Sequence, residues 1–301
     1  MQVLSDKKNI AIHLNAHIKK FGYRPEHHLY LYLYDVDPGY ELTYFDFDED
    51  GGIVLHRKEK RWYIIDEPLA LPEKKAVLFL EVLKYIFSKQ PSLYPQISIE
   101  KWTKGFRDEV SKILPSSYRM IRPNTVYYSP IINLEKFDET LAGGHMKGLR
   151  YVRNHFLKNY KIEIKDAREA PTDEILRLLK IWTKMRTAHD KVWAPDYVKF
   201  IQDGFPECVI KRVVYTNGTL RGLSVGWKIP NSEGYYIYID IHDYSDEYIG
   251  EFVSLDHILE TKKMGFKYLD FGGSDKGLLN FKKKFHPEYV YKTYNFTIKR
   301  D

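Results

Sequence analysis

The sequence predicts an α/β protein (α+β in arrangement) made of two successive halves, each a mixed, largely antiparallel sheet flanked by helices. Three observations predict this class. Strand-like apolar runs joined by short turns alternate with amphipathic, helix-like segments. The same order, several strands and then a long helix, occurs twice along the chain. The length of 301 residues is also comfortable for two domains.

The composition is that of a globular protein with a mildly basic balance. Net charge is +6, which is compatible with a polyanionic partner such as RNA or with peripheral contact at an anionic membrane face. The only cysteine, Cys208, rules out a disulfide within the chain. The most apolar helix-like segment, 76–87, is interrupted by Glu81 and Lys84 and is too short to span a bilayer. We therefore expect a cytoplasmic protein, at most peripheral to the inner membrane face.

The first half begins with a helix-like segment, Lys7–Lys20, that ends at Gly22. Four strand-like runs follow: His28–Tyr34, Tyr40–Phe47, Ile53–Arg57 and Arg61–Ile65. A turn at Asp37-Pro38-Gly39 separates the first two of them. A long amphipathic helix is then expected to begin at Pro72.

The second half begins near Gly143-Gly144, which divides the chain into domains 1–142 and 143–301. Thr172 is the expected N-cap of a helix with an apolar stripe formed by Ile175, Leu178, Leu179, Trp182 and Met185. Three strands follow at 208–216, 220–229 and 234–242, and Asn217-Gly218 predicts a tight hairpin between the first two. A helix (250–264), a short strand (267–271), another helix and a last strand (289–299) complete the series.

The segment "FGGSDKGLLNFKKKFHP" (Phe271–Pro287) carries the densest set of candidate site residues. If its second part is a helix turning about 100° per residue, Leu278, Phe281 and Phe285 share one face. Lys283 and Lys284 then point away from that face. Lys282 lies among the apolar residues, so its ammonium either reaches water along the edge or enters a pocket that needs a charge.

The glycines of this segment allow a substrate to approach the backbone closely, or simply form a structural turn. The run "GGSDKG" matches neither of the phosphate-binding glycine patterns, so a nucleotide loop is not indicated.

A basic segment, "HMKGLRYVRNHFLKNYK" (His145–Lys161), contains no acidic residue. As a helix it would project Lys147, Arg150, Arg153 and Lys158 from the side opposite its apolar stripe. Such a helix suits phosphates of RNA or lipid. The alternative is an ordinary amphipathic helix with a solvated face.

The strand "GYYIYIDIH" places Tyr238 and Asp240 on the same face, because strand side chains alternate. Asp240 could orient an amine or act as a general base. The alternative is a strand-end carboxylate in water or in an ion pair. The closely spaced histidines His13, His17, His27 and His28 have no Cys or acidic partner at ligand spacing, so no metal site is expected.

These segments resemble the phosphatidylglycerol lysyltransferase C-terminal domain family and the related Fem-type aminoacyl transferases. The resemblance rests on "KYLDFGGSDKGLLNFKKKFHP", on "KGLRYVRNHFLKN" and on "LKIWTKMR" (Leu179–Arg186). It covers roughly residues 140–300 well and the earlier part only in element order. It implies two tandem GNAT-like acyltransferase domains, with the acyl-transfer site in the second.

The resemblance also implies transfer of an aminoacyl group from aminoacyl-tRNA to an anionic lipid, a peptide or a small amine, without a tightly bound cofactor. Lys282 of the Phe281-Lys282 pair would stabilise the oxyanion, and Asp240 joins it as a catalytic candidate. The expected substrate-binding residues are Phe281, Gly272, Gly273, Ser274, Gly277, Trp182, Arg186 and Tyr238. The basic helix would contact tRNA or an anionic acceptor.

Two other functions remain open. The first is an acyl-CoA-dependent N-acetyltransferase on the same fold. Four carboxylates (Asp243, Asp246, Glu247 and Glu251) stand where such an enzyme would bind pyrophosphate, and they argue against CoA. The second is an inactive relative that binds RNA or a membrane surface, in which Lys282 would have no catalytic role.

Overall fold

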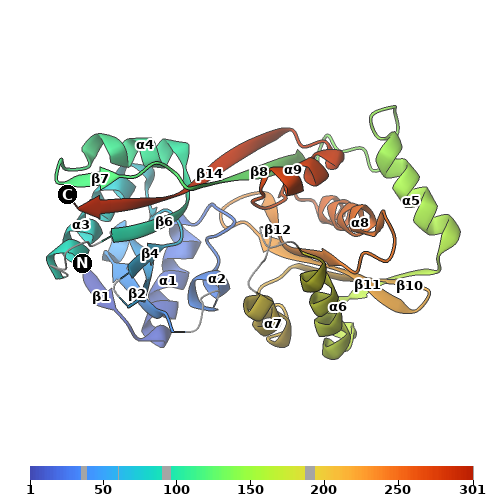
Figure 1. Cartoon of the computed structure of the whole chain (residues 1–301), viewed down its shortest axis with the longest axis horizontal. Helices are drawn as coiled ribbons and strands as arrows, with labels where there is room; N and C mark the ends of the chain where they lie inside the picture. Colours follow the sequence, from blue (N-terminus) through green and yellow to red (C-terminus); the bar gives the residue numbers. More distant parts are fainter. Residues whose placement is uncertain (35–38, 60, 90–95, 187–193, 301) are drawn as a thin grey trace.

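Two helix-and-sheet halves lie side by side along the long axis of the protein, as the computed structural model in Figure 1 shows. The structure describes residues 1–34, 39–59, 61–89, 96–186 and 194–300. The elements of the first half are, in chain order, β1 (Gln2–Leu4), α1 (Lys7–Phe21), α2 (Leu29–Tyr34), β2 (Glu41–Asp46), η1 (Asp48–Asp50), β3 (Gly51–Lys58), β4 (Arg61–Ile64), β5 (Leu69–Ala70), α3 (Pro72–Lys89), β6 (Gln96–Thr103), α4 (Lys104–Ile113), β7 (Tyr118–Met120) and β8 (Thr125–Asn133).

The second half contributes α5 (Lys147–Asn159), β9 (Ile162–Asp166), η2 (Ala167–Glu169), α6 (Thr172–Met185), α7 (Ala194–Gln202), β10 (Ile210–Thr216), β11 (Thr219–Lys228), β12 (Gly234–His242), α8 (Ile249–Lys263), β13 (Tyr268–Asp270), α9 (Lys276–Lys282), η4 (Lys283–Phe285) and β14 (Tyr289–Arg300). The mixed α/β class and the predominance of antiparallel pairing agree with the sequence prediction. The Asn217-Gly218 hairpin is also confirmed, because Thr216 pairs with Thr219 across it.

Within the described residues, a single 14-stranded sheet runs through both halves in the order β1-β2-β3-β4-β6-β14-β8-β13-β12-β11-β10-β9, with β5 on β3 and β7 on β14. Only β4 with β6 and β12 with β13 run parallel among these described pairs. The strand that joins the halves is β14. It pairs with β8 along Tyr289–Asn295 and with β6 along Thr293–Lys299. The division at 142/143 stays a prediction, since β14 contributes to the sheet on both sides.

Leu29–Tyr34 forms a helix, α2, so the prediction of a strand over His28–Tyr34 is wrong. The alternation of Leu and Tyr resembles a strand pattern. However, Tyr30, Leu31, Tyr32 and Leu33 are all buried. The alternation of the two residue types therefore does not mark a buried face and a solvent-exposed face. A short apolar run that is buried on every side carries no periodicity that separates helix from strand. The expected turn at 37–39 lies partly outside the described residues.

Two details of α6 also differ from expectation. The helix begins at Thr172 itself, and Pro171 occupies the N-cap position without a side-chain cap. Met185, expected in the apolar stripe, is exposed at the end of the helix. The other four stripe residues are buried as predicted.

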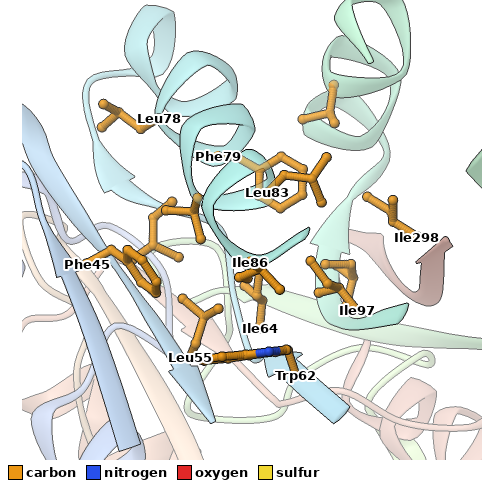
Figure 2. Close-up of a cluster of buried hydrophobic side chains, with 14 of the residues drawn as sticks. Phe45, Leu55, Trp62, Ile64, Leu78, Phe79, Leu83, Ile86, Ile97 and Ile298 are labelled. Carbon is orange, nitrogen blue, oxygen red and sulfur yellow. The ribbon is translucent and has the colours of Figure 1, made fainter. Parts of the chain in front are cut away.

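The core of the first half forms where α3 packs on the inner face of β2, β3, β4 and β6. Figure 2 shows Phe79, Leu83 and Ile86 of α3 pointing toward Leu55, Ile64 and Ile97 of the strands. Ile298 of β14 belongs to the same cluster. The C-terminal strand therefore contributes to the core of the first half.

In the second half, helices cover both faces of the sheet: α6 and α7 lie on one side and α8 on the other (Figure 1). The first side is filled by residues such as Trp182, Phe200 and Trp227, and the second by residues such as Tyr235 and Ile258. Strand β12 keeps the predicted alternation, with isoleucines buried and Tyr236, Tyr238 and Asp240 half-buried. A register shift opposite Val225 and Gly226 bulges β12 at Tyr238.

A second bulge lies on β6. The register steps from Tyr294–Trp102 to Phe296–Ile99, so Glu100 and Lys101 together oppose Asn295 of β14. Lys101 has a φ of 57°, in the left-handed region. Bulges of this kind redirect side chains next to functional sites. Both bulges border the cavity described next.

Candidate active site

A cavity of about 570 Å³ lies where the two halves meet. Its lining residues come from β6, β8, β12, β14, α6, α7, α9 and three loops, which precede α2, follow α6 and follow β13. They are Glu26, Glu100, Lys101, Tyr127, Ser129, Trp182, Arg186, Asp196, Tyr197, Tyr236, Ile237, Tyr238, Asp240, Ile241, Phe271, Gly272, Gly273, Ser274, Asp275, Leu278, Phe281, Lys282 and Thr293. The lining contains both acidic and basic side chains, so the cavity suits a polar ligand that carries charge.

The turn Gly272–Ser274 forms part of the cavity wall. Gly272 has a φ of +78°, which favours glycine. Its N–H donates to Oδ1 of Asp270 at 2.8 Å, and the Tyr291 hydroxyl donates to Oδ2 of the same carboxylate at 2.7 Å. Ser274 is fixed to β8, because its hydroxyl donates to the Tyr128 carbonyl at 2.9 Å. The turn is thus held by a strand on either side.

Lys282 is the buried lysine of the three in this segment, as the helical wheel predicted. It is 7% exposed, whereas Lys283 and Lys284 are both exposed. Its ammonium donates to the Gly272 carbonyl at 2.9 Å and lies 5.4 Å from the centre of the Phe271 ring. Lys284 instead forms an ion pair with Glu251. The cation of Lys282 is therefore fixed at the glycine turn, in the cavity wall.

Asp240 lies in the same cavity with an incomplete set of hydrogen bonds. The Ser254 hydroxyl donates to Oδ2 at 2.5 Å, while Oδ1 is buried and has no hydrogen-bond partner among the described residues. Burial raises the pKa of Asp240 to about 7, although the Ser254 hydrogen bond and the Lys282 charge both oppose this shift. A carboxyl that titrates near neutral pH in a cavity can accept a proton from a reacting group.

Asp270 is a second perturbed carboxyl, set behind the glycine turn. Burial raises the pKa of Asp270 to about 6, against the Tyr291 hydrogen bond and the Lys282 charge that lower it. The negative charge of Glu26 adds to the increase. Because both of its oxygens are occupied by Tyr291 and Gly272, Asp270 positions the turn and does not face a substrate directly.

The remaining residues expected to bind substrate divide into two groups. Trp182, Arg186, Tyr238, Phe281, Gly273 and Ser274 line the cavity together with Gly272, Asp240 and Lys282. Arg186 lies over the Trp182 ring, 4.7 Å from its centre. Gly277 is exposed in the first turn of α9 and does not line the cavity.

The four basic residues of α5 lie away from the cavity, and α5 is the helix at the outer edge of the second half (Figure 1). Lys147 and Lys158 are exposed. The guanidinium of Arg150 donates to the carbonyls of Leu141 and Gly143. Arg153 donates to those of Glu139 and Thr140, each at 3.1 Å. The two arginines therefore hold the loop before α5, and this role did not appear in the sequence pattern.

The turn between β12 and α8 is acidic, and its carboxylates are bound by residues of other elements. Asp243 accepts from Arg221 at 2.5 Å, and Asp246 accepts from the Tyr160 hydroxyl at 2.7 Å. Glu251 pairs with Lys284. A Cβ at Gly250 would lie 2.7 Å from the His242 ring. The absence of a side chain at Gly250 therefore makes room for the ring of His242, not for a ligand. The argument from sequence against a pyrophosphate at this turn stays a prediction.

Sequence reasoning missed the residues that the first half supplies to the cavity, above all Glu26, Glu100, Lys101, Tyr127 and Ser129. Their positions depend on the pairing of β14 with β6 and β8, which links segments far apart in the chain. Local periodicity carries no signal for such pairings. The described residues contain no cluster of three or more metal-ligating side chains. No helix in the described part of the chain is both long and apolar enough to cross a membrane.

Comparisons with known proteins agree with this geometry. The sequence profile of the family described as "Phosphatidylglycerol lysyltransferase, C-terminal" matches residues 41–297. No curated protein matches the sequence significantly.

Among solved structures, L-PGS from Bacillus licheniformis superposes with a TM-score of 0.69 at 14% identity, over 98% of this chain and 92% of that one. FemX superposes with a TM-score of 0.57 at 11% identity, over 99% and 97% of the two chains. A tandem GNAT protein from the clavulanic acid biosynthesis pathway superposes with a TM-score of 0.54 at 10% identity, over 99% and 98%. These similarities confirm the tandem GNAT-like fold.

Proposed function

Since the chain belongs to the phosphatidylglycerol lysyltransferase C-terminal family, we propose that it transfers an aminoacyl group from aminoacyl-tRNA to an acceptor. Membership of this family supports a transferase role. The observation that carries the proposal is the buried ammonium of Lys282, fixed beside a glycine turn in a charged cavity. The dependence on tRNA and the roles of individual residues are part of what we propose.

Lys282 would stabilise the negative charge that develops on the ester carbonyl oxygen. Its ammonium is already desolvated and oriented by the Gly272 carbonyl, so little reorganisation is needed as the charge forms. An interaction of this kind, stronger in the transition state than in the ground state, accelerates the chemical step.

Asp240 would accept the proton that the acceptor loses. The acceptor's O–H or N–H transfers its proton to the carboxylate, and the freed oxygen or nitrogen forms a bond to the carbonyl carbon. The bond between that carbon and the tRNA ribose oxygen then breaks, and the ribose oxygen takes the proton from Asp240. The raised pKa of about 7 suits both steps near neutral pH.

The tRNA body would contact the surface outside the cavity. The exposed Lys147 and Lys158 of α5 supply positive charge there, and Arg150 and Arg153 add to it while holding the adjacent loop. The acceptor classes that remain compatible are an anionic lipid, a peptide and a small amine.

The test is to incubate the protein with radiolabelled aminoacyl-tRNAs and a cell extract. We expect label to move into a lipid, peptide or amine acceptor, and RNase treatment before the reaction should abolish the transfer. Label transfer that requires acetyl-CoA, and no tRNA, would instead identify the N-acetyltransferase alternative. Binding of tRNA or of anionic vesicles without any transfer would identify the inactive-relative alternative.

A further inference from the structure

The β6 bulge is a strained segment that is held in place from two sides. A left-handed conformation is unfavourable for a non-glycine residue, so Lys101 keeps it only because the surroundings require it. Its N–H donates to Oδ1 of Asn295 at 2.9 Å, and its carbonyl accepts from Nη2 of Arg24 at 2.7 Å. As a result, Lys101 lines the cavity, although its strand belongs to the first half.

Glu26 lies beside this bulge, in the loop between α1 and α2. It is 9% exposed and lines the cavity. Its Oε1 is 4.0 Å from Nζ of Lys101, and its Oε2 is 3.6 Å from Nη2 of Arg24. Oε2 is buried and makes no hydrogen bond within the described residues. Both cations are thus beyond hydrogen-bond distance.

The other carboxylates around Arg24 are much better compensated. Nη1 of Arg24 donates to Glu67 at 2.9 Å, and Nε lies 3.1 Å from Asp66. Glu67 also accepts from the Thr103 hydroxyl at 2.6 Å and pairs with Lys75 at 3.0 Å. Burial raises the pKa of Glu67, but Arg24 and Lys75 outweigh it and lower that pKa to about 2. Arg24 and Lys75 thus lie closer to Asp66 and Glu67 than to Glu26, whose nearest cations are Arg24 at 3.6 Å and Lys101 at 4.0 Å.

A buried carboxylate without a close donor is costly unless a ligand supplies the missing partner. Two other carboxyls near this cavity, Asp240 and Asp270, are also acidic, and the ammonium of Lys282 donates to the Gly272 carbonyl. A cation with several N–H donors would complete the site.

We propose that Glu26 receives the α-ammonium of the transferred aminoacyl group, and that the Lys101 bulge holds Glu26 at the cavity. The first half would thereby be a substrate-binding part of the protein. This inference rests on the proposed function, since it takes an aminoacyl ester as the ligand.

An aminoacyl ester carries one group for each of these two charges, an ammonium for Glu26 and a carbonyl oxygen for Lys282. Its ammonium and its carbonyl carbon are bonded to the same Cα. A protein group that fixes the ammonium therefore also restricts the position of the carbonyl carbon. Glu26 and Lys282 line the same cavity, and the charges of both act on Asp270. A ligand held by Glu26 at the ammonium would present its carbonyl oxygen toward Lys282.

The test uses binding and needs no tRNA. Amides of the twenty L-amino acids, each paired with its 2-hydroxy counterpart, are titrated at pH 6.5 by ligand-observed NMR. At this pH the amides carry an ammonium that the hydroxy compounds lack. We expect at least one amide to bind the wild type at least about tenfold more tightly than its counterpart, and Glu26→Gln to remove this preference. Glu26→Asp should restore part of it.

Glu41→Gln, an exposed carboxylate of β2, is the matched control and should leave the preference unchanged. The midpoint of thermal unfolding checks that Glu26→Gln is folded. The inference is overturned if no amide shows the preference, or if Glu26→Gln retains it. Unchanged tRNA-dependent transfer in Glu26→Gln would overturn the inference about Glu26 and leave the proposed function intact. Ammonium-selective binding without any tRNA-dependent transfer would contradict the proposed function alone.

Discussion

Lys282 has surroundings that its two neighbouring lysines lack. It is buried with its ammonium on the Gly272 carbonyl, while Lys283 is exposed and the exposed Lys284 pairs with the buried Glu251. Three consecutive residues of the same type therefore offer an internal control. Their side chains are identical, and only their environments differ.

We predict that Lys282→Ala lowers the rate constant of aminoacyl transfer by about 100-fold or more, because it removes a preorganised charge at the oxyanion. Lys283→Ala and Lys284→Ala should remain within about threefold of wild type, as expected for surface positions. Single-turnover transfer assays measure all three. Similar losses in the three variants would contradict the assignment of Lys282.

Asp240 gives a pH signature at the same site. Because its pKa is raised to about 7, the carboxylate needed for proton acceptance forms only as pH rises through neutrality. We predict that the transfer rate increases from pH 6 to pH 8 and that Asp240→Asn abolishes this increase. A pH–rate profile with the same rise in Asp240→Asn would assign the proton acceptor to another group.

The same shift has a consequence for stability, with a defined sign. The folded pKa lies above the unfolded value, so the contribution of Asp240 to stability is favourable below the unfolded pKa and is lost as pH rises through about 7. Asp240→Asn should therefore unfold at a higher temperature than wild type at pH 8, and at a similar temperature at pH 4. Calorimetry at the two pH values provides the comparison.

At the scale of elements, the β6 bulge depends on backbone conformation as well as on its anchors. Glycine adopts a φ of 57° readily, whereas a β-branched residue does so only with strain. We predict that Lys101→Val is less stable than Lys101→Gly by about 1–2 kcal/mol in urea unfolding. Both variants lose the same ammonium, so the difference isolates the backbone. Equal stability would mean that the bulge relaxes.

Elements whose apolar residues recur with a clear helix or strand spacing could be predicted from the sequence. Features that depend on contacts between residues far apart in the chain could not. The helix around Lys282 and the alternation in β12 follow from residue spacing alone, and both led to cavity residues. The α2 segment failed because its apolar run is buried on all sides. Glu26 and Lys101 were missed because their roles depend on Arg24 and Asn295, which are distant from Lys101 in sequence.

At the scale of the whole molecule, the two halves share one sheet and part of their cores. Ile298 of β14 packs in the core of the first half, while Tyr291 of the same strand holds the glycine turn of the second. Separating the halves would break both contacts. The cavity between them would then lose one of its walls.

We therefore predict that the halves unfold together. In urea, hydrogen exchange of β3 in the first half and of β11 in the second should report the same free energy of opening, because the shared strand couples them. Tryptophan fluorescence and far-UV circular dichroism should give coincident transitions. Two separated transitions would indicate that the halves are independent.

The position of β14 also determines when the sheet can be completed as the protein is synthesised. β14 lies between β6 and β8 but follows both of them in the chain by more than 150 residues. Until residues 289–300 leave the ribosome, β6 and β8 each present an unpaired edge to the cell, which is a hazard for association with other chains. The bulge at Lys101 cannot be anchored before then either, because Asn295 supplies one of its hydrogen bonds. The nascent protein therefore carries the cavity residues of its first half, such as Glu26 and Lys101, long before the cavity can form.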